Sequence, residues 1–338
     1  MSDGVAQAEK YLLTKYVFVD TEAFRRAQYD WDGKVLSKLA RFAKDGHVRL
    51  LITDITIREV CSQLGEWKAE AMNAVRKYEV VFGQLQESGA VATLSDPGAL
   101  PKLEAAFAHF LRVTKAIDVP IVTSVNEILL DYFARRPPFS SKKKAEFPDA
   151  IVIASLRAWC EERKAKAYVV SADQDMEACC SSSGPLLYAK SITDIISQAT
   201  VSKELHDALE RALFNSEALE DLLSEQLRRL TVVRGDMRLR DLTGEVQDVG
   251  DIQVLSVNVL DRDEMTFTCE IEFEAGLALR LEIEHEEDYE PRFQRTARSI
   301  YRIFGAEVVV RFDPKNPSAV EFESVYVPKA PVELSVKD

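Results

Sequence analysis

The sequence predicts an α/β domain with a mainly parallel sheet flanked by helices, followed by a smaller antiparallel β domain. Short apolar runs alternate with segments of helical spacing over the first 200 residues, which is typical of parallel strands joined by helices. From Leu242 onward, apolar residues recur at every second position, as in antiparallel sheets. A leucine-rich segment separates the two patterns. We therefore place the domains at residues 1–200 and 232–330, with a helical connector over 201–231.

The strands and helices of the first domain follow from this alternation. Four short apolar runs are expected to form strands, at residues 16–19, 48–52, 167–170 and 186–189. Helical spacing predicts helices over residues 34–44, 54–86, 98–117, 124–134, 148–163 and 191–198. The leucines, glutamates and arginines of 202–230 predict one long helix, which is also a candidate contact in a homo-oligomer.

The second domain is expected to be a sheet joined by Gly and Asp turns. Its alternating segments are 252–259, 266–272, 277–283, 307–312 and 319–327. Residues 231–338 hold 13 Lys and Arg against 23 Asp and Glu, whereas residues 1–230 hold 30 against 33. Because affinity for a polyanion comes largely from Lys and Arg, any nucleic-acid contact should come from the first domain. The acidic β domain is instead a candidate docking site for a protein partner.

Composition excludes several classes of protein. The chain has 338 residues, of which 46% are hydrophobic, enough for a sizeable core. Its apolar runs are far shorter than the roughly 20 residues that cross a bilayer, and nothing resembles a signal peptide, so we expect a soluble protein without membrane contact. The five cysteines form no CxxC or zinc-type spacing, which favours reduced thiols and a cytoplasmic location. The four histidines are scattered, and there is no Gly-rich dinucleotide motif or P-loop.

Four carboxylates lie where strands end or helices begin. Asp20 closes the apolar run 16–19, and Asp173 follows the run ending at Val170, so both lie at the strand ends where ligands of parallel sheets bind. Glu59 and Asp149 lie in early helical turns. Mg²⁺ and Mn²⁺ prefer hard oxygen ligands, so the set suggests a divalent-metal site.

Each carboxylate also has a purely structural interpretation. Asp20 would make a good N-cap, and Glu59 completes the capping-box spacing Thr56-x-x-Glu59. Asp149 follows Pro148 in a first helical turn, where a carboxylate complements the helix dipole, and Asp173 or Asp175 would cap the next helix. The metal-site hypothesis therefore depends on the four occurring together.

Taken in order, these motifs resemble the PIN domain, a family of metal-dependent nucleases related in fold to flap endonucleases. The resemblance covers roughly residues 14–200 and rests on four segments: Val19-Asp20-Thr21, Ile57-Arg58-Glu59-Val60, Phe147-Pro148-Asp149-Ala150 and Val170-Ser171-Ala172-Asp173-Gln174-Asp175. The form Phe-Pro-Asp-Ala is similar to a larger PIN-like subgroup. The chain departs from the family pattern in the 90-residue, mostly helical stretch between Glu59 and Asp149, and in carrying Glu22 after the Asp-Thr pair.

The resemblance implies a Mg²⁺- or Mn²⁺-dependent endonuclease, most often acting on single-stranded or loop RNA. It assigns catalysis and metal binding to Asp20, Glu59, Asp149 and Asp173, with Asp175 as a further metal ligand. Two alternatives stay open: a catalytically silent PIN-like module that binds RNA or protein, and a nuclease directed at DNA.

Candidate substrate contacts come from basic and hydroxyl side chains near these motifs. The stretch from Arg135 to Lys144, which includes Lys142 and Lys143, could hold the phosphate backbone while Phe139 stacks a base. A solvated loop explains the same stretch equally well. Arg58 is a weaker phosphate candidate. Thr21 and Ser171 could orient a carboxylate or bind phosphate, although the polarity of surface turns also accounts for them.

Overall fold

The computed structural model describes residues 12–82, 98–121, 124–139, 147–180, 184–234, 242–287, 290–317, 319–329 and 331–334. The chain divides into two compact units, one of residues Leu12–Ala199 and one built on Thr200–Asp338.

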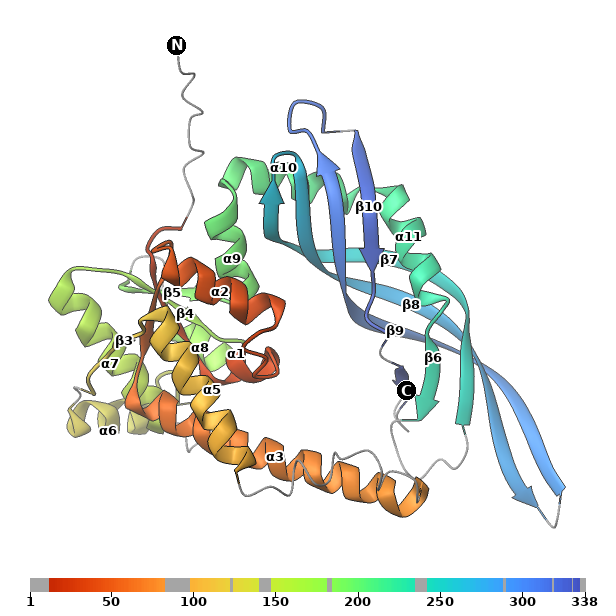
Figure 1. The fold of residues 1–338 in the computed structure, drawn as a ribbon, viewed down its shortest axis with the longest axis horizontal. Helices are drawn as coiled ribbons and strands as arrows, with labels where there is room; N and C mark the ends of the chain where they lie inside the picture. The colour runs from red at the N-terminus through yellow and green to blue at the C-terminus, as the bar shows by residue number, and fades with distance from the viewer. Residues whose placement is uncertain are drawn as a thin grey trace. The chain divides into compact units, whose positions relative to one another are not determined.

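The first unit is built around a five-stranded, all-parallel sheet with the strand order β3-β2-β1-β4-β5 (Figure 1). Its strands are β1 (Tyr16–Val19), β2 (Arg49–Ile52), β3 (Ile117–Asp118), β4 (Ala167–Val170) and β5 (Leu186–Ala189). The four predicted strands are therefore confirmed. The two-residue strand β3 was not predicted, because so short an element shows no periodicity, and its first residue coincides with the end of the helix expected over 98–117.

The helices of this unit follow the predicted segments closely. They are α1 (Thr21–Arg26), α2 (Lys34–Lys44), α3 (Asp54–Phe82), α5 (Ala99–Thr114), α6 (Val125–Ala134), α7 (Phe147–Arg163), α8 (Gln174–Ala178) and α9 (Ile192–Thr200). The sequence missed α1 and α8, which have only six and five residues and so carry little periodic signal. Both begin directly after a candidate carboxylate.

Helix α7 packs on the parallel sheet. Its residues Val152, Ile153 and Leu156 are buried against Phe18 and Val169 of the sheet. A three-residue connection leads from α7 into β4, so the helix runs back along the sheet. The N-terminus of α7 therefore lies toward the edge where the parallel strands end, which is the edge that binds ligands in such sheets.

The second unit is a six-stranded sheet with the order β10-β9-β8-β7-β6-β11, covered by two helices (Figure 1). The strands are β6 (Thr231–Arg234), β7 (Leu242–Asp263), β8 (Thr266–Glu287), β9 (Glu290–Phe312), β10 (Val320–Tyr326) and β11 (Val332–Leu334). All neighbours are antiparallel except β11, which pairs with β6 in parallel. The predicted antiparallel β domain is thus confirmed with one parallel edge strand.

The prediction of one long helix over 202–230 is wrong. The segment forms α10 (Lys203–Phe214) and α11 (Glu217–Leu227), because Ser216 starts a new helix by accepting a hydrogen bond from the Leu219 amide at 3.2 Å. Their buried leucines share one core with the sheet: Leu209, Leu213, Leu219, Leu223 and Leu227. The role of residues 201–231 as a connector stays a prediction.

The strands of this sheet are longer than their sequence pattern indicated. The segments 266–272 and 277–283 were expected as separate strands, yet β8 runs through Gly276 without a break. The Tyr301 ring on the neighbouring strand lies 3.2 Å from where a Cβ of Gly276 would be. An aromatic side chain over a cross-strand glycine restores the packing that the glycine lacks. In β7, four register shifts interrupt the alternation, and the one between Val254 and Ser256 leaves Leu255 as an extra, exposed residue.

Among the described residues, no helix is long and apolar enough to span a membrane. All five cysteines are free thiols, three of them buried.

Candidate active site

Asp20 lies at the junction of β1 and β4, at the carboxyl edge of the parallel sheet. Its backbone amide donates to the Val170 carbonyl at 3.0 Å and so extends the pairing of the two strands by one residue. Its carboxylate accepts two hydrogen bonds, from the Thr21 amide at 2.7 Å and from the Ser171 hydroxyl at 2.8 Å. Asp20 is therefore the N-cap of α1 and also faces the end of β4, as the chain order of parallel strands predicts.

Glu59 is tied to the same place through Thr21. Thr21 is only 4% exposed, and its hydroxyl donates to Oε2 of Glu59 at 3.0 Å. The capping-box interpretation of Glu59 is wrong, because α3 is capped by Thr53, whose hydroxyl accepts from the Thr56 amide at 3.1 Å. Helix α3 thus starts three residues earlier than a Thr56 cap would require. The Glu59 side chain instead contacts Thr21, which follows β1 at the carboxyl edge of the sheet.

Asp173 joins the network from the other side of Ser171. The fully buried Ser171 hydroxyl accepts a hydrogen bond from the Asp173 amide at 3.1 Å. Asp173 in turn caps α8, its Oδ1 accepting from the Asp175 amide at 2.8 Å. For both Asp20 and Asp173, the capping interpretation is correct and coexists with a place beside the other carboxylates.

Asp149 lies in the first turn of α7, and both it and Asp175 lie within electrostatic range of Cys179. Both of their negative charges raise the pKa of the Cys179 thiol, which reaches about 12 mainly because the thiol is buried. A thiol held protonated in this way is a packing residue.

The electrostatics of this edge suit a cation. The pKa of Asp20 is raised from 3.8 to about 6, mainly because the group is buried. The hydrogen bonds from Ser171 and the Thr21 amide lower this pKa, and the charges of Glu59 and Asp173 raise it. No three of the predicted carboxylates bring ligand atoms within 4.8 Å of one another in the part of the chain that is described. Instead, the buried residues Thr21 and Ser171 link Asp20 to Glu59 and to the backbone of Asp173. A hard divalent cation bound beside these carboxylates would relieve the repulsion between their charges.

The residues predicted to contact substrate differ in whether they are buried, exposed or outside the described part of the chain. Phe139 is only 3% exposed and packs against Tyr132 and Phe147, so it cannot stack a base, and that interpretation is wrong. Lys142, Lys143 and Lys144 lie outside the described residues. Arg58 is exposed and pairs with Asp54 at 2.7 Å. The hydroxyls of Thr21 and Ser171 contact carboxylates, and their burial rules out the surface-turn interpretation.

Phe133 is an aromatic residue that the sequence did not single out. It is 76% exposed on α6, and its ring lies 5.3 Å from that of Tyr132, which packs against Phe147 at the start of α7. Phe133 thus has an exposed aromatic ring. It is connected through Tyr132 to Phe147, which lies in the same helical turn as Asp149. Only the burial of Phe139 distinguishes the two phenylalanines, and burial is a tertiary property.

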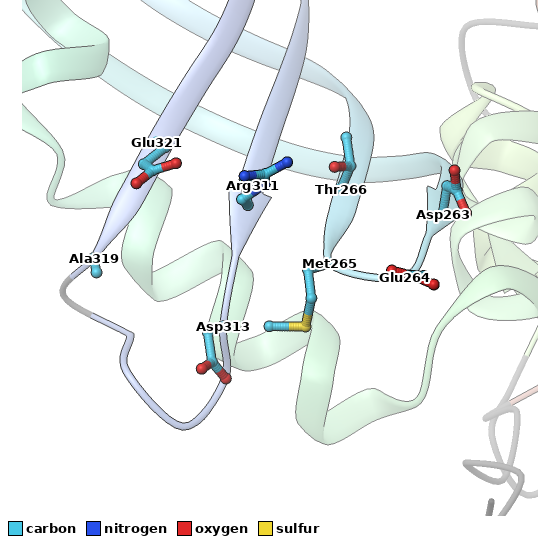
Figure 2. Close-up of a pocket in the computed structure, with 8 residues that line it drawn as sticks. All are labelled: Asp263, Glu264, Met265, Thr266, Arg311, Asp313, Ala319 and Glu321. Atoms are coloured by element: carbon cyan, nitrogen blue, oxygen red, sulfur yellow. The ribbon is translucent and has the colours of Figure 1, made fainter.

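The second unit contains a pocket of different character. It has a volume of about 520 Å³ and lies at the ends of β7, β8, β9 and β10, as Figure 2 shows. Its lining includes four carboxylate side chains, Asp263, Glu264, Asp313 and Glu321, with Arg311 as the one cation among the lining residues. A lining with this charge is unfavourable for a phosphate, so this pocket is not a candidate for nucleic acid.

Comparisons with known proteins agree with the geometry of the first unit. A family model described as PIN domain matches residues 17–176, which span β1 to α8 and include all five candidate metal ligands. No curated protein and no solved structure matched the chain.

Proposed function

Because residues 17–176 form a PIN domain, we propose that this protein is a metal-dependent endonuclease that cleaves single-stranded or loop RNA. PIN domains are generally nucleases. The observation that carries the proposal is the chain of hydrogen bonds from Glu59 through Thr21, Asp20 and Ser171 to Asp173 at the carboxyl edge of the sheet. The preference for RNA over DNA rests on the resemblance to the family.

In the proposed site, Asp20, Glu59, Asp149 and Asp173 hold Mg²⁺ or Mn²⁺, with Asp175 as an additional ligand. Their oxygens are the hard donors that these cations prefer. The bound ion would activate water and stabilise the leaving oxygen of the phosphodiester. Thr21 and Ser171 act as positioning residues, since each hydroxyl fixes the direction of a carboxylate. We further propose that the protein works in the cytoplasm, where its free thiols would stay reduced.

The experiment that tests the proposal is cleavage of a labelled single-stranded RNA by the purified protein in Mg²⁺, in Mn²⁺ and in EDTA. We expect internal cleavage with either metal and none in EDTA. The Asp149→Asn protein, purified identically, controls for contaminating ribonuclease, because the substitution removes one ligand charge at nearly constant volume. Cleavage of a DNA strand of the same sequence at an equal rate would favour the DNA-directed alternative. Metal and RNA binding without cleavage would favour the catalytically silent module.

Ser171→Ala is expected to slow cleavage about tenfold at neutral pH and to shift the acidic limb of the pH–rate profile to higher pH. The Ser171 hydroxyl lowers the pKa of Asp20, so its loss leaves Asp20 protonated over a wider range, where it competes less well for metal. The rate should recover partly at pH 8.5. The exposed Ser37→Ala is the matched control. A uniform loss of rate with an unshifted profile would contradict the positioning role.

Phe133→Leu is expected to weaken binding of single-stranded RNA roughly tenfold, whereas Phe133→Trp should preserve it. Stacking of a base on an aromatic face contributes about 1–3 kcal/mol, and leucine keeps apolar area but not the face. Arg135, two residues on and exposed, adds positive charge next to the ring. Fluorescence anisotropy in Ca²⁺ would measure binding without turnover. Equal affinities for the Leu and Trp variants would show that Phe133 does not stack a base.

The partners of the second unit remain proposals. Its excess of carboxylates over basic residues makes it a poor ligand for RNA, so we propose that it docks a protein. The buried leucines of α10 and α11 pack within their own unit, so a homo-oligomer formed by these helices would have to use their polar faces.

A further inference from the structure

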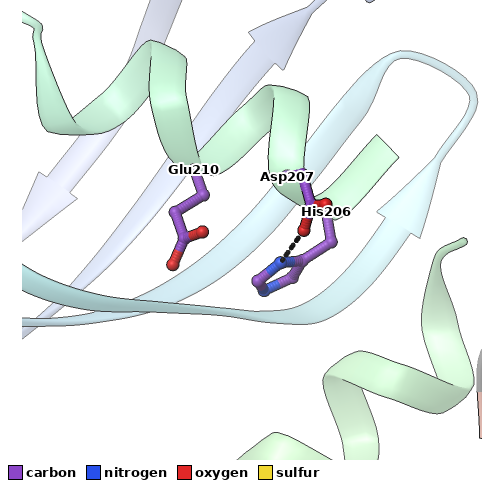
Figure 3. A group of neighbouring side chains, drawn as sticks. All are labelled: His206, Asp207 and Glu210. Atoms are coloured by element: carbon purple, nitrogen blue, oxygen red, sulfur yellow. Dashed lines mark ion pairs between the residues drawn. The ribbon is translucent and has the colours of Figure 1, made fainter. Parts of the chain in front are cut away.

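A second group of metal-ligating side chains lies in the second unit, far in sequence from the nuclease motifs. His206, Asp207 and Glu210 project from the first two turns of α10, as Figure 3 shows. Each offers one ligand atom, and these three atoms all lie within 4.8 Å of one another. Within the described part of the chain, no other set of three His, Cys, Asp or Glu residues meets this distance.

The orientation of the His206 ring is fixed from outside the group. Its Nε2 lies 2.9 Å from the Val257 carbonyl oxygen on β7, and a carbonyl can only accept, so Nε2 carries the hydrogen. In the neutral ring, Nδ1 then holds a lone pair and lies 3.8 Å from Oδ1 of Asp207. The side chain is 14% exposed, so the ring is packed in this orientation and does not project freely into solvent. Histidine ligands typically donate their second nitrogen to a carbonyl in this way.

We propose that His206, Asp207 and Glu210 bind a divalent transition-metal ion, for which Zn²⁺ is the natural probe. One imidazole nitrogen and two carboxylates offer three ligand atoms within reach of a single cation. The imidazole nitrogen selects Zn²⁺ over Mg²⁺, which prefers oxygen ligands. Three protein ligands leave a position for water, as in open zinc sites.

The site would also have a structural consequence. The metal would hold the ring of His206 on one side, and the Val257 carbonyl holds it on the other. Because α10 packs on β7 within one core, a bound ion would fasten the helix to the strand. Zn²⁺ would therefore stabilise the second unit selectively.

The test is the stoichiometry of Zn²⁺ binding to the full-length protein by calorimetry, with excess Mg²⁺ present to occupy sites made only of oxygen. We expect Glu210→Gln and His206→Gln each to remove one Zn²⁺ site, or weaken it at least 100-fold, while the matched variant Glu204→Gln leaves it unchanged. Glu204 is an exposed carboxylate on the same helix outside the group. Losing a direct ligand should exceed the 10–100-fold cost of losing an outer one.

X-ray absorption of the Zn²⁺ protein identifies the ligands. The proposal requires nitrogen and oxygen neighbours at about 2.0–2.2 Å, with imidazole scattering that His206→Gln loses. Unchanged stoichiometry in both Gln variants would overturn it, and so would a sulfur shell at about 2.3 Å, which would assign the ion to the free thiols. If His206→Gln fails to fold, as judged by circular dichroism, Asp207→Asn on the exposed side of the group replaces it, with the same expected loss.

Discussion

Replacing Asp20 by Asn is expected to reduce RNA cleavage on the order of 1,000-fold and, without metal, to make the first unit more stable. Asp20 accepts hydrogen bonds from both neighbouring segments and occupies the centre of the proposed ligand set. Losing its charge should remove several kcal/mol of metal-dependent stabilisation of the transition state, at about 1.4 kcal/mol per tenfold in rate. A gain in stability together with a loss of activity is the signature of a residue retained for function.

The stability effect has a defined dependence on pH. Asp20 has a folded-state pKa of about 6, above the 3.8 of an unperturbed Asp, so the folded state binds the proton more tightly than the unfolded state. Stability from this group is therefore greatest below about pH 4 and falls as the pH rises through 6. We expect Asp20→Asn to raise the free energy of unfolding by roughly 2 kcal/mol at pH 7.5 in EDTA. The gain should largely disappear at pH 4.

Guanidinium unfolding followed by tryptophan fluorescence measures the stability of the first unit, which contains Asp20. All three tryptophans, Trp31, Trp67 and Trp159, lie in the first unit. Adding Mg²⁺ should stabilise the wild type and leave the variant unchanged. The matched control is Asp45→Asn, an exposed carboxylate beyond α2. A variant that keeps more than about a tenth of the wild-type rate would rule out Asp20 as an essential ligand.

Phe273→Ala is expected to destabilise the second unit by about 3–5 kcal/mol, the usual cost of emptying a fully buried aromatic site. Phe273 lies at the middle of β8, is 0% exposed and stacks on Phe304 of β9 at 5.6 Å between ring centroids. Its removal would leave a cavity between the sheet and its helices, because the neighbouring strand ladders cannot collapse into it. Glu274→Ala, the next residue and on the opposite face of the strand, should cost less than about 1 kcal/mol.

Two spectroscopic signals separate the effect on each unit. Circular dichroism reports both units, whereas tryptophan fluorescence reports only the first. Phe273→Ala should move the dichroism transition and leave the fluorescence midpoint in place, since the two units have separate buried cores. A fluorescence midpoint that shifts equally would mean that the units unfold as one cooperative body.

Much of the fold was readable from local pattern. The strands 16–19, 167–170 and 186–189 are fully or largely buried apolar runs, and their bounds match the sequence prediction. Helices such as α2 show a continuous apolar stripe with polar residues opposite, which is a strong periodic signal. Where periodicity is weak or interrupted, the prediction failed: at the short α1 and α8, and in β7, whose bulges displace the alternation.

The second unit shows why local signals mislead over longer distances. The pattern around Asn215 permits a continuous helix, and only packing of the two leucine faces on one sheet requires the break that Ser216 caps. The pattern around Gly276 indicates a turn, and only Tyr301 from another strand explains why the strand continues. In both cases the deciding contact comes from a segment distant in the chain.

The sequence by itself determined the order of the two domains, the parallel sheet and the residue types of the candidate metal site. Those features follow from periodicity, from turn chemistry and from the rule that parallel strands end at one edge. Tertiary structure alone decided which groups touch. Thr21 contacts both Glu59 and Asp20, and Ser171 contacts both Asp20 and Asp173. It also decided that Phe139 is buried while Phe133 is exposed. Hydrogen bonds and burial depend on distances between segments up to about 150 residues apart, and a one-dimensional pattern does not contain those distances.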